Sequence, residues 1–144
     1  MIIHPDWQKA IQLLETGGYT CVLCRGASTH TAAERGVKPL VRFLENKIDA
    51  NGFFAADRVV GKATAYLYVL LGVQCVYAHV MSRSAAEVLE ENGITAAYGT
   101  LAEHIINRRG DGICPFEAAV LDIHDPHRAY PAIREKMIQM NIPL

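Results

Sequence analysis

The stretch from residue 54 to residue 99 most constrains the fold of this chain, because its pattern predicts a helix, a strand, a second helix and a second strand in succession. Asp57 is expected to cap the first helix. Apolar residues follow at intervals of three and four, and Gly72 then ends the helix. These apolar residues are Val59, Ala63, Leu67, Leu70 and Leu71.

The other three elements of this stretch predict a parallel crossover. Residues 74–80 (QCVYAHV) have the β-branched and aromatic content of a buried strand. Ser84 and Glu87 fit the S-x-x-E capping box, so the second helix is expected to begin there and to end at Gly93. Residues 94–98 are short and apolar enough for the next strand. Short connections between these elements imply a right-handed crossover with helices covering the sheet.

Further elements are expected on both sides of this stretch. Those before it are a helix from Pro5 to the Gly17-Gly18 pair, a β-hairpin of residues 19–24 and 28–32, and a short helix over 37–44. Those after it are helices over 101–108, 116–123 and 131–140. We therefore predict a single α/β domain over residues 1–144, with three layers. Its mixed sheet has four to five strands, a hairpin followed by parallel strands, and helices on both faces.

Composition narrows the class of protein. Half of the 144 residues are apolar and the net charge is −1, which argues against a disordered chain and against a dedicated nucleic-acid binder. The longest apolar run, residues 65–73, is too short to span a bilayer, and the first residues lack the pattern of a signal peptide. We expect a cytoplasmic protein with reduced cysteines and with neither nucleic acid nor membrane as a partner.

Residues 57–62 predict a ligand site, because they occupy the place where open α/β sheets bind ligands. Lys62 lies in the first turns of the expected helix, where a cation opposes the helix dipole. A bound anion at that N-terminus would explain it, and Gly61 would let a ligand approach the backbone closely. The alternative is a solvated lysine beside a glycine that packs on the sheet, and the sequence leaves both readings open.

The segment Cys114-Pro115-Phe116-Glu117 is the sharpest local motif, with Cys114 expected at an N-cap and Pro115 at the first helical position. A helix N-terminus raises the thiolate population of a cysteine. Glu117 works against this if its charge is close, or it reaches back to the cap N–H as in a capping box. Structural capping is favoured over nucleophilic catalysis, because no histidine spacing marks a general base.

Two other motifs resemble metal sites and are interpreted otherwise. Cys21 and Cys24 lie three apart in an expected strand, so their sulfurs point to opposite faces, and no second Cys pair completes a zinc site. His124 and His127 flank a break and lack a third ligand. We interpret the first pair as core cysteines and the second as surface or helix-capping histidines.

Residues 82–99 resemble part of the zinc-dependent cytidine deaminases. In that family one helix begins with His or Cys, any residue and Glu, and the next begins with Pro-Cys-x-x-Cys and runs to a Gly-Ile pair. Counting back from Gly93-Ile94 places Ser82 and Ala85 where the two cysteine ligands would stand, and residues 59–63 supply neither the third ligand nor the glutamate. Zinc-activated water needs these groups, so the resemblance implies the fold without a metal or other cofactor.

The whole chain more closely resembles the DUF1893 family, a small bacterial family of unknown function whose type member, from Thermotoga, has a deaminase-like fold. The matching residues are the segments 36–40 (GVKPL), 57–63 (DRVVGKA) and 112–117 (GICPFE). This resemblance implies a cytidine deaminase-like α/β fold and no established activity.

We take as the leading hypothesis that the chain binds a small anionic or nucleotide-like ligand at the former deaminase pocket. The residues expected to line it are Asp57, Gly61, Lys62, Ser82 and Ser84. One alternative is a transferase or hydrolase that depends on Cys114 and Glu117. Another is a non-catalytic scaffold that self-associates, and the sequence decides neither the oligomeric state nor whether the protein is an enzyme.

Overall fold

The computed structural model describes residues 3–144. Its strands are β1 (Cys21–Arg25), β2 (Ser28–Ala32), β3 (Phe54–Val60), β4 (Cys75–Ser82) and β5 (Thr95–Ala102). Its helices are α1 (Pro5–Gly17), α2 (Lys38–Glu45), α3 (Lys62–Leu71), α4 (Arg83–Glu91), α5 (Pro115–Ala119) and α6 (Pro126–Gln139). No helix in this part of the chain combines the length and the apolar character needed to cross a membrane.

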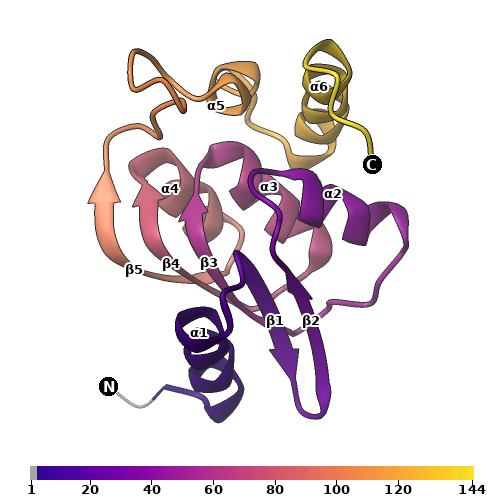
Figure 1. The fold of residues 1–144 in the computed structure, drawn as a ribbon, viewed down its shortest axis with the longest axis vertical. Coiled ribbons are helices and arrows are strands. Elements are labelled where there is room, and N and C mark those ends of the chain that lie inside the picture. Colours follow the sequence, from indigo (N-terminus) through magenta and orange to yellow (C-terminus); the bar gives the residue numbers. More distant parts are fainter. Residues whose placement is uncertain (1–2) are drawn as a thin grey trace.

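The strands form one open mixed sheet in the order β2-β1-β3-β4-β5 (Figure 1). β1 is antiparallel to both β2 and β3, and β3, β4 and β5 run parallel to one another. Asp57 of β3 pairs with Cys21 on one side and with Ala78 on the other, so β3 is the central strand. The predicted α/β class, with a hairpin followed by parallel strands, is confirmed.

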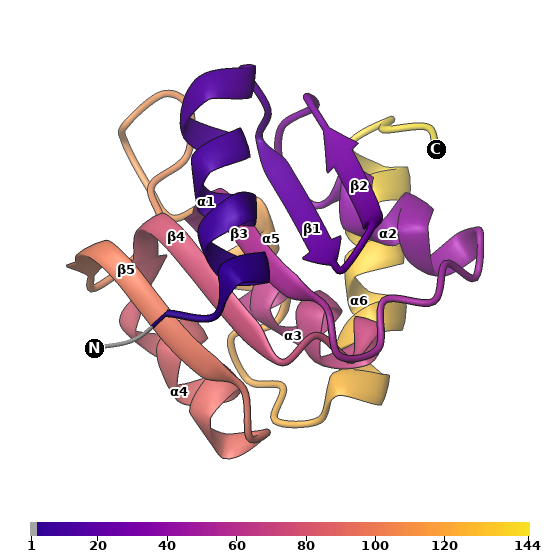
Figure 2. The same cartoon turned by 90° about the horizontal axis from the view of Figure 1, so that it is seen from below.

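Helices cover both faces of this sheet. α1 lies across β1 and β3 on one face (Figure 2), where the indole N–H of Trp7 donates a hydrogen bond to the carbonyl of Ala55 at 3.1 Å. The helices α2, α3 and α4 cover the other face, and α6 packs against α3 further from the sheet (Figure 1). The largest apolar core therefore lies between the sheet and α3, with fully buried Leu67 and Tyr68 at its centre.

The structure corrects the start of the central helix. Asp57 is not an N-cap: it lies inside β3, and α3 begins at Lys62 with Gly61 as its N-cap. Residues of β3 pair with strands on both sides, and this double ladder of hydrogen bonds outweighs the helical spacing of the apolar residues. Val59, which was assigned to the apolar face of the helix, is 45% exposed on the strand instead.

The N-cap of α4 is also displaced from its predicted place. Ser82 caps this helix, because its Oγ accepts a hydrogen bond from the backbone N–H of Ala85 at 3.1 Å. The predicted capping box of Ser84 and Glu87 is wrong, and Glu87 is exposed. β4 runs two residues further than predicted because it remains paired with β5 as far as Ser82, which fixes the start of the helix.

The helix predicted over residues 101–108 does not exist. β5 continues to Ala102, and the chain then forms a loop closed by an isolated antiparallel bridge between Ile106 and Ile113. Within that loop the side chain of Asn107 donates to Asp111 at 2.9 Å. The last helix begins at Pro126 rather than Pro131, capped by Asp125, so Pro131 lies inside α6.

Candidate functional site

A cavity of about 1050 Å³ lies at the carboxyl end of β3, beside the N-terminus of α3. Its other walls come from the start of β1, the segment leading into α2, the β5–α5 loop and the chain after α6. Open α/β sheets commonly bind ligands outside the carboxyl ends of their strands. The volume suits a small molecule of the size that such clefts usually hold.

Four of the predicted site residues line this cavity, although they are distant in sequence. They are Asp57, Gly61, Cys114 and Glu117. The other three, Lys62, Ser82 and Ser84, do not line it. Ser82 is fully buried and Ser84 lies 3.2 Å from it, Oγ to Oγ, so these hydroxyls serve the start of α4.

The charged end of Lys62 is turned away from the cavity. Its Nζ donates a hydrogen bond to the carbonyl of Leu121 at 3.0 Å and lies 5.9 Å from the ring centroid of Tyr66. The hydroxyl of Tyr66 donates to the carbonyl of Ile123 at 2.7 Å. Lys62 and Tyr66 therefore fasten the α5–α6 connection to α3, and the lysine gives no direct charge to a ligand in the cavity.

Asp57 is a buried carboxyl group in the wall of the cavity. Tyr68 donates a hydrogen bond to its Oδ2 at 2.6 Å, the N–H of Val59 donates to its Oδ1 at 3.3 Å, and the sulfur of Cys21 lies 3.2 Å from the Tyr68 hydroxyl. Burial raises the pKa of Asp57 to about 6, against the opposing effect of these hydrogen bonds. Burial likewise raises the pKa of Tyr68 well above its ordinary value. The cavity thus contains a carboxyl group whose pKa is raised well above its ordinary value, as is common at functional sites.

Glu117 is the second buried carboxylate of the cavity and is only 6% exposed. Its Oε1 has no hydrogen-bond partner among residues 3–144. Oε1 packs directly against the N-cap of α3, because a Cβ built on Gly61 would lie 2.6 Å from it. Glycine at position 61 therefore makes room for the carboxylate, and the partial positive charge of the helix N-terminus favours the negative charge there.

Cys114 is the N-cap of α5, as predicted, but the predicted capping box is not formed. The N–H of Cys114 donates to the carbonyl of Ile105 at 2.8 Å, across the bridged loop, instead of to Glu117. The thiol is partly exposed, whereas Cys21, Cys24 and Cys75 are buried. No histidine is among the residues that line this cavity, so the thiol has no imidazole base there.

Basic side chains line the same cavity, and the sequence analysis missed them. Arg35, Arg108 and Arg109 line the cavity, are exposed, and make no ion pair within the described residues. The pair at 108 and 109, next to the Gly110-Asp111-Gly112 segment, was the only sequence signal. Arg35 is 73 residues away from Arg108 in the chain, so no local pattern could connect them.

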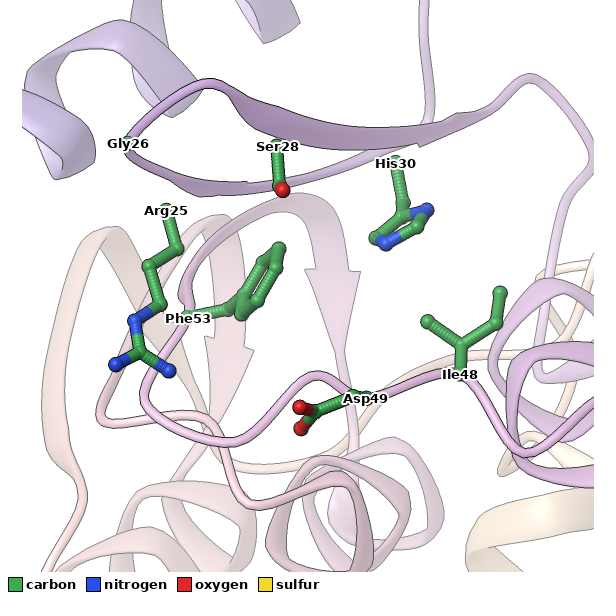
Figure 3. A pocket seen from close by; sticks show the side chains of 7 residues that line it. All are labelled: Arg25, Gly26, Ser28, His30, Ile48, Asp49 and Phe53. Atoms are coloured by element: carbon green, nitrogen blue, oxygen red, sulfur yellow. The ribbon is translucent and has the colours of Figure 1, made fainter.

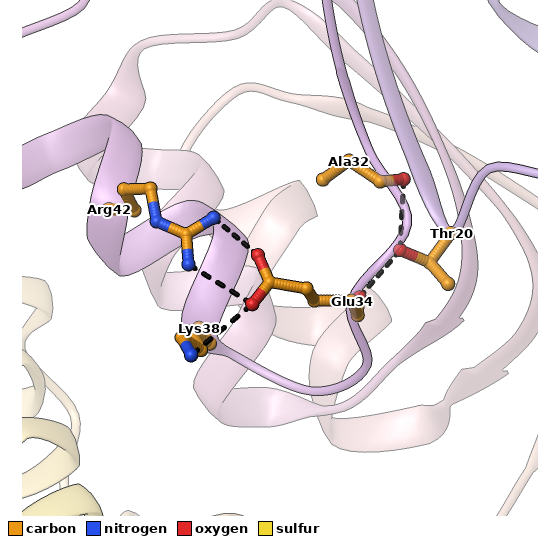
Figure 4. Close-up of polar contacts among 5 residues, drawn as sticks. All are labelled: Thr20, Ala32, Glu34, Lys38 and Arg42. Carbon is orange, nitrogen blue, oxygen red and sulfur yellow. Dashed lines mark hydrogen bonds and ion pairs between the residues drawn. The ribbon is translucent and has the colours of Figure 1, made fainter. Parts of the chain in front are cut away.

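A clamp centred on Glu34 holds the wall of the cavity that leads into α2 (Figure 4). Arg42 binds both oxygens of its carboxylate, and Lys38 lies 3.3 Å from it. The hydroxyl of Thr20 contacts the carbonyl of Ala32 at 3.1 Å and that of Glu34 at 2.6 Å. The pKa of Glu34 is lowered to about 2, mainly by the hydrogen bond from Arg42. Lys38 and Arg42 thus share the Glu34 carboxylate, whereas Arg35, Arg108 and Arg109 make no ion pair within the described residues.

A second cavity, of about 610 Å³, lies at the opposite end of the sheet near the β1–β2 turn (Figure 3). Phe53 lies between Arg25 and His30 there, with its ring stacked on His30 at a centroid distance of 5.6 Å. Arg25 donates to the carbonyl of Asn51 at 2.7 Å. This cavity lies at the amino end of β3, whereas open α/β sheets bind ligands at the carboxyl ends of their strands, so the cavity at the carboxyl end is the better candidate site.

The cysteine pair in β1 does not form a metal site. Cys21 packs against Tyr68 in the core on the α3 side, whereas Cys24 packs with Ala10 and Leu14 of α1 on the other face. The prediction that the two sulfurs diverge is confirmed. Among residues 3–144, no group of three or more His, Cys, Asp or Glu residues is arranged to hold a metal ion.

The fold and the site together define an open α/β domain with a ligand-sized cavity at the carboxyl end of its central strand. Comparison with family models matches residues 9–137 to a domain of unknown function, DUF1893, and the chain belongs to that family. A crystal structure of a DUF1893 family protein from Thermotoga maritima is similar, with a TM-score of 0.82 and 26% identity. The similarity covers 96% of this chain and 92% of that one. No curated protein matches the chain.

Proposed function

We propose that this protein binds a small anionic, nucleotide-like molecule in the cavity at the carboxyl end of β3. The observation that carries the proposal is the buried carboxylate of Glu117, whose Oε1 lacks a partner among residues 3–144, in a cavity that is also lined by Arg35, Arg108 and Arg109. Buried polar groups are nearly always satisfied, so an unsatisfied one in a cavity favours a ligand that completes it. Acceptor and cationic groups in one cavity suit a ligand with donor groups at one end and an anion at the other.

The arginines supply the chemistry for the anionic end. A guanidinium group presents several N–H donors in a planar fork, which matches the oxygens of a phosphate or carboxylate. Arg35, Arg108 and Arg109 are exposed and are not engaged by carboxylates of the described residues. They are therefore free to bind an anion without first breaking an ion pair.

Exposed apolar side chains supply the chemistry for a flat or apolar part of the ligand. Val59, Ile106 and Met140 are 45%, 55% and 42% exposed, and all three line this cavity. Exposed apolar side chains that gather at one site mark a contact surface more often than singly scattered ones do. A nucleobase offers such a surface together with polar edges, which favours a nucleotide over a simple inorganic anion.

A cytidine deaminase-like scaffold without zinc is part of this proposal. The order of a hairpin followed by parallel strands and the resemblance of residues 82–99 support it. Ser82 and Ala85 stand at the positions of two zinc ligands, and the buried Ala85 has no group that could bind a metal. The free cysteines agree with a reducing, cytoplasmic compartment.

A Cys114-dependent transferase or hydrolase is the second candidate function. It is supported by the position of Cys114, the most accessible cysteine, in the wall of the same cavity as Glu117. A nucleophilic cysteine usually has an adjacent base that activates it. The absence of a histidine from the lining residues makes binding the better-supported function.

The proposal is tested by thermal shift and calorimetry with a panel of nucleoside 5′-monophosphates and diphosphates. A nucleotide that binds the folded state should raise the melting temperature in a concentration-dependent way. Replacing Arg108 and Arg109 together by Gln should weaken binding about tenfold or more, because charge-assisted hydrogen bonds are lost.

Arg128→Gln is the matched control, because Arg128 is exposed and lies outside the cavity. It should leave the affinity unchanged. The proposal fails if no nucleotide on the panel binds, or if the Arg128 variant loses as much affinity as the double variant.

A further inference from the structure

The geometry around Glu117 points to a specificity determinant, and we propose that Glu117 selects ligands whose buried end presents an N–H donor, such as the amino group of a nucleobase. This inference rests on the nucleotide-binding function proposed above. It adds two things to that function. The ligand is oriented with its base inward and its phosphate at the arginines, and the chemical group that Glu117 recognises is an N–H donor.

The first step is the missing donor. An ionised carboxylate is an acceptor only. Oε1 of Glu117 is buried and accepts no hydrogen bond from any residue between 3 and 144. Leaving a buried charged acceptor unsatisfied is costly. A donor group of a ligand therefore adds more binding free energy at this position than it would add at the protein surface.

The second step is that the fold provides no donor side chain for this oxygen. Gly61, the N-cap of α3, has no side chain, and no side chain caps this end of the helix. A Cβ built on Gly61 would lie 3.2 Å from Cγ1 of Ile105 as well as 2.6 Å from Oε1 of Glu117. The side chains that lie near this position of the α3 N-cap are therefore the Glu117 carboxylate and the apolar Ile105, neither of which is a donor, and a donor can reach Oε1 from the cavity that Glu117 lines.

The third step concerns the anionic part of the ligand. α3 is ten residues long, and the N-terminus of such a helix by itself suits an anion. Glu117 already places a negative charge there, and Asp57 adds a second carboxyl group to the same cavity. A phosphate at this end would therefore be repelled, whereas Arg35, Arg108 and Arg109 attract it elsewhere on the cavity wall.

The test compares matched ligand pairs that differ by a single amino group. Adenosine 5′-monophosphate is compared with purine riboside 5′-monophosphate, and cytidine 5′-monophosphate with its analogue that carries hydrogen in place of the 4-amino group. For whichever pair binds, calorimetry should show about 10- to 100-fold weaker binding of the analogue, the range expected for a hydrogen bond to a charged group.

Glu117→Gln, which keeps the size of the side chain and removes its charge, should reduce or abolish this preference. It should not weaken the binding of inorganic phosphate, because the negative charge of Glu117 can only repel an anion in this cavity. Equal affinities for both members of a pair in the native protein would overturn the inference, and would mean that water alone satisfies Oε1. That comparison needs no variant, so it decides the matter even if Glu117→Gln fails to fold. No binding of any nucleotide would instead reject the proposed function on which the inference rests.

Discussion

Asp57 is a carboxyl group inside a central strand that faces a cavity rather than bulk water. Its two oxygens accept hydrogen bonds from Tyr68 and from the backbone of Val59, and it still retains a pKa of about 6 because burial dominates. An aspartate in an unfolded chain titrates near 3.8. The folded protein therefore binds a proton at this residue more tightly than the unfolded chain does.

This difference predicts how stability depends on pH. Between about pH 4 and pH 6 the folded state holds more protons at Asp57, so the free energy of unfolding should fall as the pH rises, by up to about 3 kcal/mol. Asp57→Asn should remove this slope, as measured by urea denaturation at several pH values. Glu34, with its lowered pKa, acts in the opposite direction, but only below about pH 4.5.

Asp122→Asn provides the control for this prediction, because Asp122 is exposed and its side chain is in no ion pair among residues 3–144. The free energy of unfolding of this variant should depend on pH in the same way as that of the native protein. An Asp57→Asn variant that keeps the native slope would show that another group causes the pH dependence.

At the scale of elements, the junction between β3 and α3 depends on one close contact with α5. The contact joins the backbone of Gly61 to the carboxylate of Glu117, and an added methyl group at position 61 would lie 2.6 Å from Oε1. The backbone of Gly61 has ordinary extended dihedral angles, so any penalty on substitution comes from crowding and not from strain.

A double-mutant cycle measures this contact. Gly61→Ala should destabilise the protein by about 1–3 kcal/mol through overpacking. In a Glu117→Ala background the same substitution should cost clearly less, because the crowded oxygens are gone. Urea denaturation of the four proteins gives the coupling energy, and strictly additive effects would show that Glu117 is not what position 61 accommodates.

The sequence was sufficient for most elements and for the class of fold, but less so for their boundaries. Apolar spacing and glycine stops located α1, α3 and α4, and the hairpin was recognised from its short loop. The errors at Asp57 and Ser84 share one cause. Both segments continue a strand whose hydrogen bonds go to distant parts of the chain, and local capping patterns contain no information about such pairing.

At the scale of the whole molecule, the cavity brings together segments that no local pattern connects. Asp57 and Gly61 were located because residues 57–62 were expected at the place where open α/β sheets bind ligands, and Cys114 and Glu117 were located from a local motif. The sequence could not show that Glu117 touches Gly61. Lys62 was expected to face the ligand, but its side chain reaches Leu121, because the α5–α6 connection folds back over α3. The arginines were missed because their grouping exists only in three dimensions.

The same arrangement predicts a difference in reactivity among the four cysteines. Cys21, Cys24 and Cys75 are buried, and burial raises the pKa of each of these thiols, which slows alkylation further. Cys114 is partly exposed and lines the cavity. Under native conditions iodoacetamide should therefore label Cys114 first, as followed by mass spectrometry of proteolytic peptides, and labelling in denaturant should reach all four.

A nucleotide bound in the cavity should slow the labelling of Cys114 severalfold, because it would cover the wall that contains the thiol. The Arg108 and Arg109 double variant should lose this protection at the same nucleotide concentration, since its affinity is reduced, while its unprotected labelling rate stays unchanged. Earlier labelling of Cys75 would contradict the exposure of Cys114 described here. Labelling of Cys114 that a bound nucleotide does not slow would place the ligand elsewhere on the molecule, because the thiol and the arginines line a single cavity.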